Sequence, residues 1–184
     1  MNCYVLVGGR SSRMGRPKPE LFLDRIVAAA RPVSAKVVAV QRLAGEAAPI
    51  ATIYESAHEH DGPLFGIERA LEDATSRCLI VAVDYPLVTT ELLGYLAAAA
   101  PDSPMVVPIW RGRPQPLCAI YDPAILPLVR ERIASGRLSL GGLIDEVPAT
   151  MIAEETLRAR FDGELLLNVN TPAELNEAEA LYGK

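Results

Sequence analysis

The stretch "CYVLVGGRSSRMGRPK", residues 3–18, decides the fold of this chain. Its first five residues form a continuous apolar run that stops at Gly8 and Gly9, which is typical of a strand buried on both faces of a parallel sheet. The basic residues that follow, Arg10, Arg13, Arg16 and Lys18, are not balanced by any acid within the stretch. Because ligands bind at the loops after parallel strands, this loop predicts an anion site.

The alternation of strand and helix patterns continues along the chain. Strand-like runs follow at residues 35–40, 51–54, 78–83, 104–109, 116–121 and 165–169. Helix-like segments occupy residues 19–30, 62–74, 89–100, 122–135 and 171–183. This order predicts an α/β fold: one domain over residues 1–184, a Rossmann-like three-layer sandwich with a mostly parallel sheet and helices on both faces.

Composition excludes several classes of protein. The net charge of −5 and the pI near 5.1 argue against nucleic acid and acidic membranes as partners, since both require a broad basic surface. Cys3, Cys78 and Cys118 lie far apart in apolar runs, which predicts buried, reduced thiols rather than disulfides or a zinc site. No apolar run approaches the roughly 20 residues that cross a bilayer. We therefore expect a cytoplasmic protein.

Two later loops carry further candidate residues. Asp84 ends an apolar run, and a single carboxylate at a strand end suits Mg²⁺, which takes one or two carboxylates together with phosphates and waters. The alternative is a turn former or helix cap. Asn168 and Asn170 flank Val169 at strand spacing, so their amides are expected on one face. They either contact a phosphate or a metal-bound water, or only shape the turn before the last helix.

The glycines of the basic loop favour phosphate binding. Gly8, Gly9 and Gly15 let backbone N–H groups approach phosphate oxygens without obstruction by side chains. The spacing matches neither the P-loop nor the dinucleotide fingerprint, because Gly15 is followed by Arg16, Pro17 and Lys18. From these residues alone, a basic surface turn remains the alternative.

Four segments in sequence order carry a resemblance to a known family. "LVGGRSSRMGRPK", "DGPLFGIERAL", "VDYPLV" and "LNVNTPAEL" resemble the motifs of the molybdenum cofactor guanylyltransferase family, within the nucleoside-triphosphate transferases. The resemblance implies a fold like that of the nucleotide-diphospho-sugar transferases. It also implies an enzyme that transfers GMP from Mg-GTP to molybdopterin with release of pyrophosphate. Transient contact with molybdoenzymes or cofactor-delivery proteins is a further implication.

The same resemblance assigns roles to individual residues. It implies catalytic roles for Arg13, Lys18 and Asp84, with Mg²⁺ on Asp84. Nucleotide binding is assigned to Leu6, Gly8, Gly9, Gly15, Lys18, Glu55, Gly62 and Asp84. Substrate binding is assigned to Gln115, Asn168 and Asn170. By the same similarity, Arg111 and Arg113 beside an exposed Trp110 would hold the pterin, or would be ordinary arginines of a hairpin tip.

The chain also departs from the family pattern. Pro17 stands where an acid usually precedes the lysine, and the segment between Lys18 and the first helix is shorter than usual. Three alternatives remain: a cytidylyltransferase of the same cofactor, a transferase for another small phosphorylated acceptor, and a non-catalytic binding module. By the same resemblance, the Gly8–Gly9 pair favours GTP over CTP as the nucleotide. The presence of both Asp84 and Lys18 favours an enzyme, because a binding module does not need a metal opposite the phosphates.

Overall fold

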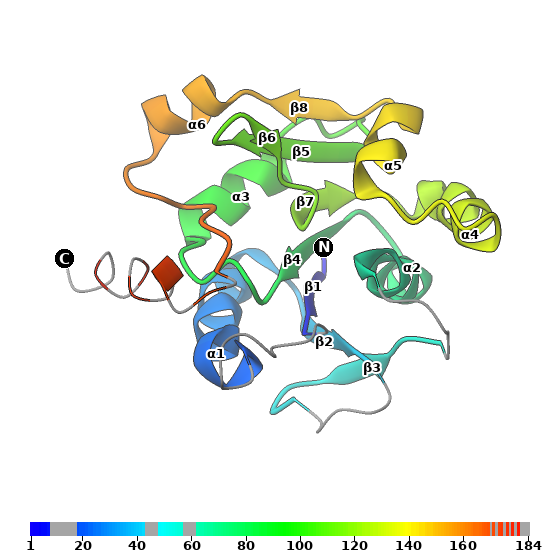
Figure 1. Cartoon of the computed structure of the whole chain (residues 1–184), viewed down its shortest axis with the longest axis horizontal. Coiled ribbons are helices and arrows are strands. Elements are labelled where there is room, and N and C mark those ends of the chain that lie inside the picture. The colour runs from blue at the N-terminus through cyan, green and yellow to red at the C-terminus, as the bar shows by residue number, and fades with distance from the viewer. Residues whose placement is uncertain are drawn as a thin grey trace.

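The computed structural model describes residues 1–7, 18–42, 48–56 and 62–169, together with residues 171, 173, 174, 176, 178 and 180. Of residues 18–21 it describes the backbone alone. The expected α/β architecture is confirmed, with a central sheet between two layers of helices (Figure 1).

The strands form one mixed sheet. They are β1 (Cys3–Leu6), β2 (Val37–Gln41), β3 (Thr52–Tyr54), β4 (Cys78–Ala82), β5 (Met105–Trp110), β6 (Arg113–Pro114), β7 (Cys118–Tyr121) and β8 (Thr150–Ile152). Their order is β3-β2-β1-β4-β7-β5-β6, and β8 pairs with β5. The first four strands are parallel, whereas β7 runs antiparallel to both β4 and β5.

The helices cover both faces of this sheet. They are α1 (Lys18–Ala30), α2 (Pro63–Asp73), α3 (Thr90–Ala98), α4 (Leu126–Ala134), α5 (Leu140–Glu146) and α6 (Glu154–Arg160), with short 3₁₀ turns at Arg31–Val33 and Pro123–Ile125. α1 and α3 contact each other on one face, and α2 and α4 contact each other on the opposite face (Figure 1). The sheet is thereby shielded from water on both sides, as its apolar strands require.

Local sequence explains these helices. α2 begins with Pro63, whose ring fixes a helical φ at a position where the missing N–H costs nothing. Its apolar stripe, which includes Leu64, Ile67 and Leu71, is buried against the sheet, and burial of each such side chain stabilises the fold by about 1.5–3 kcal/mol. In α3 the Thr89 side chain caps the helix by accepting a hydrogen bond from the Leu92 N–H at 3.2 Å.

One predicted strand is wrong. Residues 165–169 are buried as expected of an apolar run, but they form a turn followed by an irregular segment. The Leu167 N–H donates to the Glu164 carbonyl at 3.3 Å, and the Val169 N–H donates to the Asp84 carbonyl at 2.8 Å. The expectation that Asn168 and Asn170 share a strand face is therefore not met, and Asn170 lies outside the described residues.

The C-terminal segment begins a helix as predicted. Thr171 and Glu174 form a reciprocal capping box, in which the Thr171 N–H donates to Glu174 Oε2 at 2.8 Å and the Glu174 N–H donates to Thr171 Oγ1 at 3.3 Å. The described residues from 173 to 180 are helical, and Ala178 is buried.

The cysteines lie in the core, as predicted. All three are free and fully buried, on the adjacent strands β1, β4 and β7. Burial raises the pKa of Cys78 and Cys118 to about 12, so both thiols remain protonated at neutral pH.

No helix in the described part of the chain has the length and hydrophobicity needed to span a membrane.

Candidate functional site

The parallel strands end together at one edge of the sheet, which we call the carboxyl edge. Leu6 at the end of β1 is opposite Val40 in β2 and Ala82 in β4. The Val83 N–H donates to the Leu6 carbonyl at 3.0 Å and continues this alignment one residue beyond β4. The chain therefore leaves β1 beside the turn that carries Asp84.

The predicted phosphate loop departs from this edge. Gly8, Gly9, Arg13 and Gly15 lie outside the described residues, and so does the side chain of Lys18. The Lys18 backbone forms the first residue of α1. The roles assigned to these residues therefore stay predictions.

Asp84 lies at the carboxyl edge, two residues beyond β4. Its side chain is half-buried, and its carbonyl accepts the 2.8 Å hydrogen bond from the Val169 N–H. This bond holds Asn168, the neighbour of Val169, next to the Asp84 turn. A carboxylate and a carboxamide offer the oxygen ligands that Mg²⁺ prefers, so the donors present fit that ion. Among the described residues, no group of three or more His, Cys, Asp or Glu side chains forms a self-contained metal site.

Tyr85 is bonded to a predicted substrate-binding residue. Its side chain is buried, and its hydroxyl donates to Gln115 Oε1 at 2.8 Å. Asn168 precedes Val169, whose N–H is bonded to the carbonyl of Asp84, the neighbour of Tyr85. Burial raises the pKa of Tyr85 far above its ordinary value, so the hydroxyl is a neutral donor at physiological pH. The sequence analysis missed Tyr85, although its place between Asp84 and Pro86 was a usable signal.

Gln115 is fixed from several directions at the base of the β5–β6 hairpin. Its side-chain Nε2 donates to the Trp110 carbonyl at 3.2 Å and to the Arg113 carbonyl at 3.0 Å. Its backbone N–H donates to the Pro108 carbonyl at 2.8 Å. Both amide hydrogens of the side chain are thus used within the protein, and Oε1 accepts from Tyr85.

Leu6 and Glu55, both predicted to bind nucleotide, meet over the first turns of α2. A Cβ atom on Gly66 would lie 3.1 Å from Glu55 Oε1 and 3.2 Å from Leu6 Cδ2, so both side chains pack directly on that glycine. Gly62 precedes α2 in an extended conformation, and a Cβ atom there would meet nothing within 4 Å. The structure therefore gathers Leu6, Glu55 and the start of α2 at one corner of the carboxyl edge.

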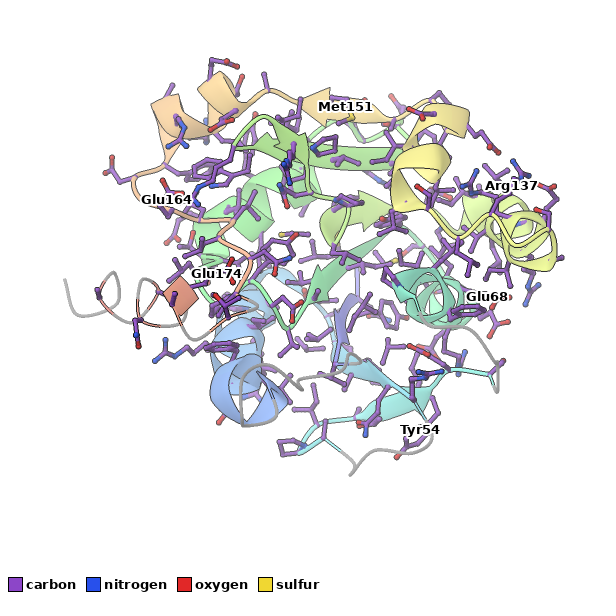
Figure 2. All side chains as sticks on the ribbon, in the orientation of Figure 1. Tyr54, Glu68, Arg137, Met151, Glu164 and Glu174 are labelled. Atoms are coloured by element: carbon purple, nitrogen blue, oxygen red, sulfur yellow. The ribbon has the colours of Figure 1, made fainter. Side chains whose placement is uncertain are left out.

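The expectation of an exposed Trp110 is wrong. Its side chain is 1% exposed, and the Arg158 guanidinium lies 4.2 Å from the ring centroid. The indole N–H donates to Glu164 Oε2 at 3.2 Å, and Arg111 forms an ion pair with the same oxygen at 3.0 Å. Glu164 lies on the segment that descends from α6 (Figure 2). Because α6 and this segment cover the indole, Trp110 cannot stack on a pterin in this structure.

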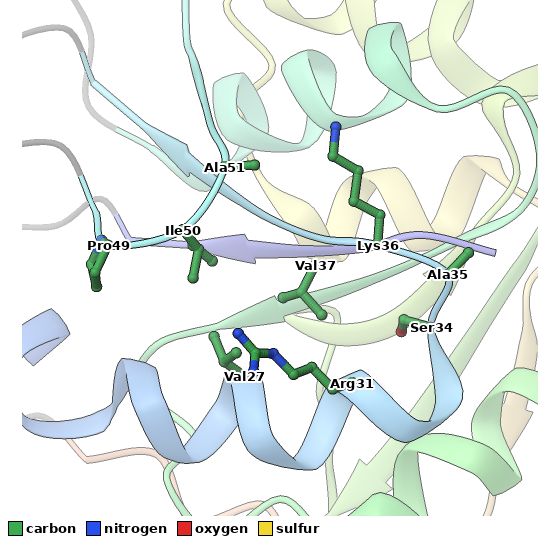
Figure 3. Close-up of a pocket in the computed structure, with 9 residues that line it drawn as sticks. All are labelled: Val27, Arg31, Ser34, Ala35, Lys36, Val37, Pro49, Ile50 and Ala51. Carbon is green, nitrogen blue, oxygen red and sulfur yellow. The ribbon is translucent and has the colours of Figure 1, made fainter.

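A cavity of about 500 Å³ lies elsewhere in the molecule, at the amino ends of β2 and β3 (Figure 3). Its lining includes Arg31, Ser34 and Lys36 from the chain between α1 and β2. The Lys36 side chain points away from Arg31, so the two cations do not converge on a common ligand position (Figure 3). The cavity contains none of the predicted site residues.

Comparison with known proteins identifies the family. The family model of the MobA-like NTP transferase domain matches residues 3–147. The chain belongs to this family. A probable molybdenum cofactor guanylyltransferase of Carboxydothermus hydrogenoformans is 32% identical over 186 aligned positions, gaps included, which cover 97% of this chain and 94% of that protein.

Solved structures agree with this membership. Molybdopterin-guanine dinucleotide biosynthesis protein A of Archaeoglobus fulgidus matches with a TM-score of 0.82 and 26% identity, over 100% of this chain and 99% of that one. The 2-C-methyl-D-erythritol 4-phosphate cytidylyltransferase of Thermus thermophilus has a TM-score of 0.74 at 18% identity, over 100% of this chain and 99% of that one, and shows the shared fold alone. The predicted family, the nucleotidyltransferase fold and the prediction of a transferase are confirmed.

Proposed function

We propose that this chain transfers GMP from GTP to the terminal phosphate of molybdopterin. One observation carries the proposal: the turn of Asp84 and Tyr85 at the carboxyl edge is bonded both to the segment that carries Asn168 and to Gln115, in a chain of the MobA-like family. Ligands of open α/β sheets bind at this edge. The choice of GTP and molybdopterin rests on the names of the relatives in Carboxydothermus and Archaeoglobus.

The reaction requires positioning and charge stabilisation rather than a protein nucleophile. An oxygen of the acceptor phosphate attacks the α-phosphorus of GTP, the bond from that phosphorus to the bridging oxygen breaks, and pyrophosphate leaves. Asp84 would hold Mg²⁺, which neutralises phosphate charge when bound. Arg13 and Lys18 would stabilise the negative charge that moves onto the leaving pyrophosphate.

The nucleoside and the acceptor would bind at opposite corners of the carboxyl edge. Glu55, which packs with Leu6 on Gly66, would face the nucleoside, because a carboxylate accepts hydrogen bonds from ribose hydroxyls and from guanine N–H groups. Asn168 would face the acceptor, on the side of the sheet edge where β7 begins and β5 ends. Asp84 lies between these corners in the order of the sheet.

Incubation of the purified chain with Mg²⁺, molybdopterin and each of the four NTPs tests this proposal. We expect pyrophosphate release and formation of the guanine dinucleotide with GTP. Faster turnover with CTP would replace the guanylyltransferase by a cytidylyltransferase. Nucleotide binding without pyrophosphate release under any condition would overturn the proposed reaction.

We also propose a reducing compartment, the cytoplasm, as the place of action. Three free, buried thiols support this location, because they remain unpaired although they lie on neighbouring strands.

A further inference from the structure

The side chain of Gln115 joins the tip of the β5–β6 hairpin to the turn that carries Asp84 and Tyr85, which we call the Asp84 turn. We infer that Gln115 is a positioning residue, which holds the hairpin tip in place for the phosphorylated acceptor and does not itself contact the acceptor. The inference rests on the proposed function and changes the role of Gln115 within it. It follows from the place of the hairpin, the hydrogen bonds of the Gln115 amide and the burial of Tyr85.

The tip of the β5–β6 hairpin lies at the carboxyl edge. Because β7 is antiparallel to both β4 and β5, β5 runs in the same direction as β4 and ends at the same edge of the sheet. The register between β5 and β6 pairs Trp110 with Arg113 and Ile109 with Pro114, which has no backbone N–H to donate. So short a two-stranded ladder is at best marginally stable in water, and further contacts are needed to hold the tip in place.

The Gln115 amide binds both sides of this tip. Its Nε2 donates to the Trp110 carbonyl at 3.2 Å and to the Arg113 carbonyl at 3.0 Å. These two residues directly precede and follow the left-handed tip Arg111–Gly112. The opposite amide orientation would place Oε1 against two carbonyl oxygens without a proton between them, so the donors and acceptors fix the orientation of the amide. Both hydrogens of Nε2 are thereby used within the hairpin, and neither is left for a substrate.

The oxygen of the same amide attaches the hairpin to the Asp84 turn. Gln115 Oε1 accepts from the Tyr85 hydroxyl at 2.8 Å. Tyr85 directly follows Asp84 and is 3% exposed, which keeps water and substrate away from its hydroxyl. The bonds from the hairpin carbonyls through Gln115 to Tyr85 therefore set the spacing between the hairpin tip and the Asp84 turn. An acceptor that reaches a nucleotide at Asp84 depends on this spacing.

Two other roles for Gln115 predict different behaviour. If Gln115 contacts the acceptor directly, its loss should weaken binding independently of Tyr85, whose buried hydroxyl does not reach the acceptor. If Gln115 is purely structural, its loss should lower Tm and leave the affinity for both substrates unchanged. A positioning residue should instead share its effect on molybdopterin binding with Tyr85.

Gln115→Met and Tyr85→Phe, alone and combined, separate these roles by equilibrium titration. We expect the dissociation constant for molybdopterin to rise about tenfold for Gln115→Met and less for Tyr85→Phe, with that for GTP unchanged. The double variant should bind no more weakly than Gln115→Met, because both substitutions break the same connection. Tyr4→Phe is the matched control: it removes another buried hydroxyl, which donates to Asp73 Oδ2 at 2.9 Å, and should leave both constants unchanged.

Limited proteolysis measures the hairpin tip without any substrate. Trypsin can cleave after Arg111, whereas Pro114 blocks cleavage after Arg113, so the fragment that ends at Arg111 reports opening of the tip. We expect this fragment to form about tenfold faster in Gln115→Met than in the unmodified chain, because the open form becomes more populated. Tyr4→Phe should not accelerate this cleavage.

Three results would each overturn the inference. They are losses of molybdopterin affinity that simply add in the double variant, an unchanged molybdopterin affinity in Gln115→Met, and an unchanged rate of cleavage after Arg111. A chain that binds molybdopterin but transfers no nucleotide would refute the proposed function, and the affinities would still decide the role of Gln115. A chain that does not bind molybdopterin would overturn both.

Discussion

The two halves of the sheet are held together in different ways. In the half formed by β3, β2, β1 and β4, parallel backbone pairing and buried apolar side chains hold the strands together, and the Tyr4 hydroxyl adds a hydrogen bond to Asp73 on α2. In the half formed by β7, β5, β6 and β8, charged side chains connect the elements: Arg132 connects α4 to α5, and Glu154 and Glu164 connect α6 and the segment after it to the β5–β6 hairpin. We name these the nucleotide half and the acceptor half after the proposed function. Hydrophobic patterns specify the strands of both halves, whereas the acceptor half also depends on individual contacts of charged side chains.

Removal of Arg132 should give the largest loss of stability in the acceptor half. This side chain is 3% exposed, and it donates to Glu146 Oε1 at 2.5 Å, to the Ser139 carbonyl at 2.9 Å and to the Gly142 carbonyl at 3.2 Å. Arg132→Ala removes this donor from the two backbone carbonyls and leaves Glu146 paired with Arg137 alone, and we expect a loss of about 3 kcal/mol in the free energy of unfolding. Urea denaturation measures this loss.

Arg130 on the same helix is the control. Its side chain is 53% exposed and pairs with Glu68 and Glu72 on α2. Such exposed pairs are worth about 0–1 kcal/mol, so Arg130→Ala should change stability little. Equal losses for the two arginine variants would show that the buried contacts of Arg132 stabilise the protein no more than the exposed pairs of Arg130 do.

Unlike Arg132→Ala, Asp84→Asn in the nucleotide half should lower activity and leave stability nearly unchanged. The substitution keeps the size of the side chain and removes its charge, so Tm should stay nearly constant. We expect kcat to fall roughly a hundredfold or more, about 2.7 kcal/mol in the activation barrier, because the carboxylate ligand for Mg²⁺ is lost. Steady-state kinetics beside thermal melts gives the comparison. An unchanged kcat at an unchanged Tm would refute the metal-binding role.

The difference between the two halves of the sheet also explains which parts of the fold could be predicted from the sequence. Apolar runs at residues 78–83 and 35–40 identified β4 and β2, since strands buried on both faces need uninterrupted hydrophobic residues. The run at residues 165–169 has the same character, but none of the described strands pairs with it, and it forms a turn and an irregular segment. Hydrophobicity predicted its burial and could not predict its hydrogen-bond partners.

The acceptor half could not be predicted because its contacts join residues that are far apart in sequence. Trp110 followed by Arg111 is typical of an exposed hairpin tip, but the indole is buried, in contact with Arg158 and Glu164, which lie about 50 residues further along the chain. The helix α5 begins next to the pair Gly141–Gly142, an unfavourable composition for a helix. A Cβ atom on Gly142 would lie 2.7 Å from the Arg132 guanidinium, so the glycine is required by a contact that no local pattern reveals.

Glu164→Ala should destabilise the acceptor half by an intermediate amount. The variant leaves the buried indole N–H of Trp110 without this acceptor and removes the ion pair of Arg111 with Glu164. An unsatisfied buried donor typically costs about 1–3 kcal/mol. Glu68→Ala on α2 is the matched control, because Glu68 pairs with the largely exposed Arg130 (Figure 2). We expect the denaturation midpoint to fall clearly for Glu164→Ala and little for Glu68→Ala, and the reverse order would contradict the comparison.

The smallest expected effect concerns Glu154 and depends on pH. Glu154 Oε2 accepts from the Gly112 N–H at 2.8 Å, and its other oxygen pairs with Arg158 at 2.7 Å. These contacts, the Gly112 bond first, lower the pKa of the Glu154 carboxyl below its ordinary value. A carboxyl with a lowered pKa in the folded state stabilises the fold above its unfolded pKa of about 4.3, and this contribution is lost as pH falls through the folded pKa.

Glu154→Gln removes this titration and keeps an oxygen that can still accept the Gly112 hydrogen bond. Arg111 and Gly112 both adopt positive φ values, 50° and 68°, and the Glu154 carboxylate stabilises this left-handed tip by accepting the Gly112 backbone hydrogen bond. At pH 7 the variant should therefore be slightly less stable than the unmodified chain, and the difference should shrink as pH is lowered below about 4. Urea midpoints of both chains at a series of pH values between 7 and 3 measure this. A difference that stays constant over that range would mean that the charge of Glu154 does not hold the hairpin, and that the geometry of the tip depends on the Glu164 contacts alone.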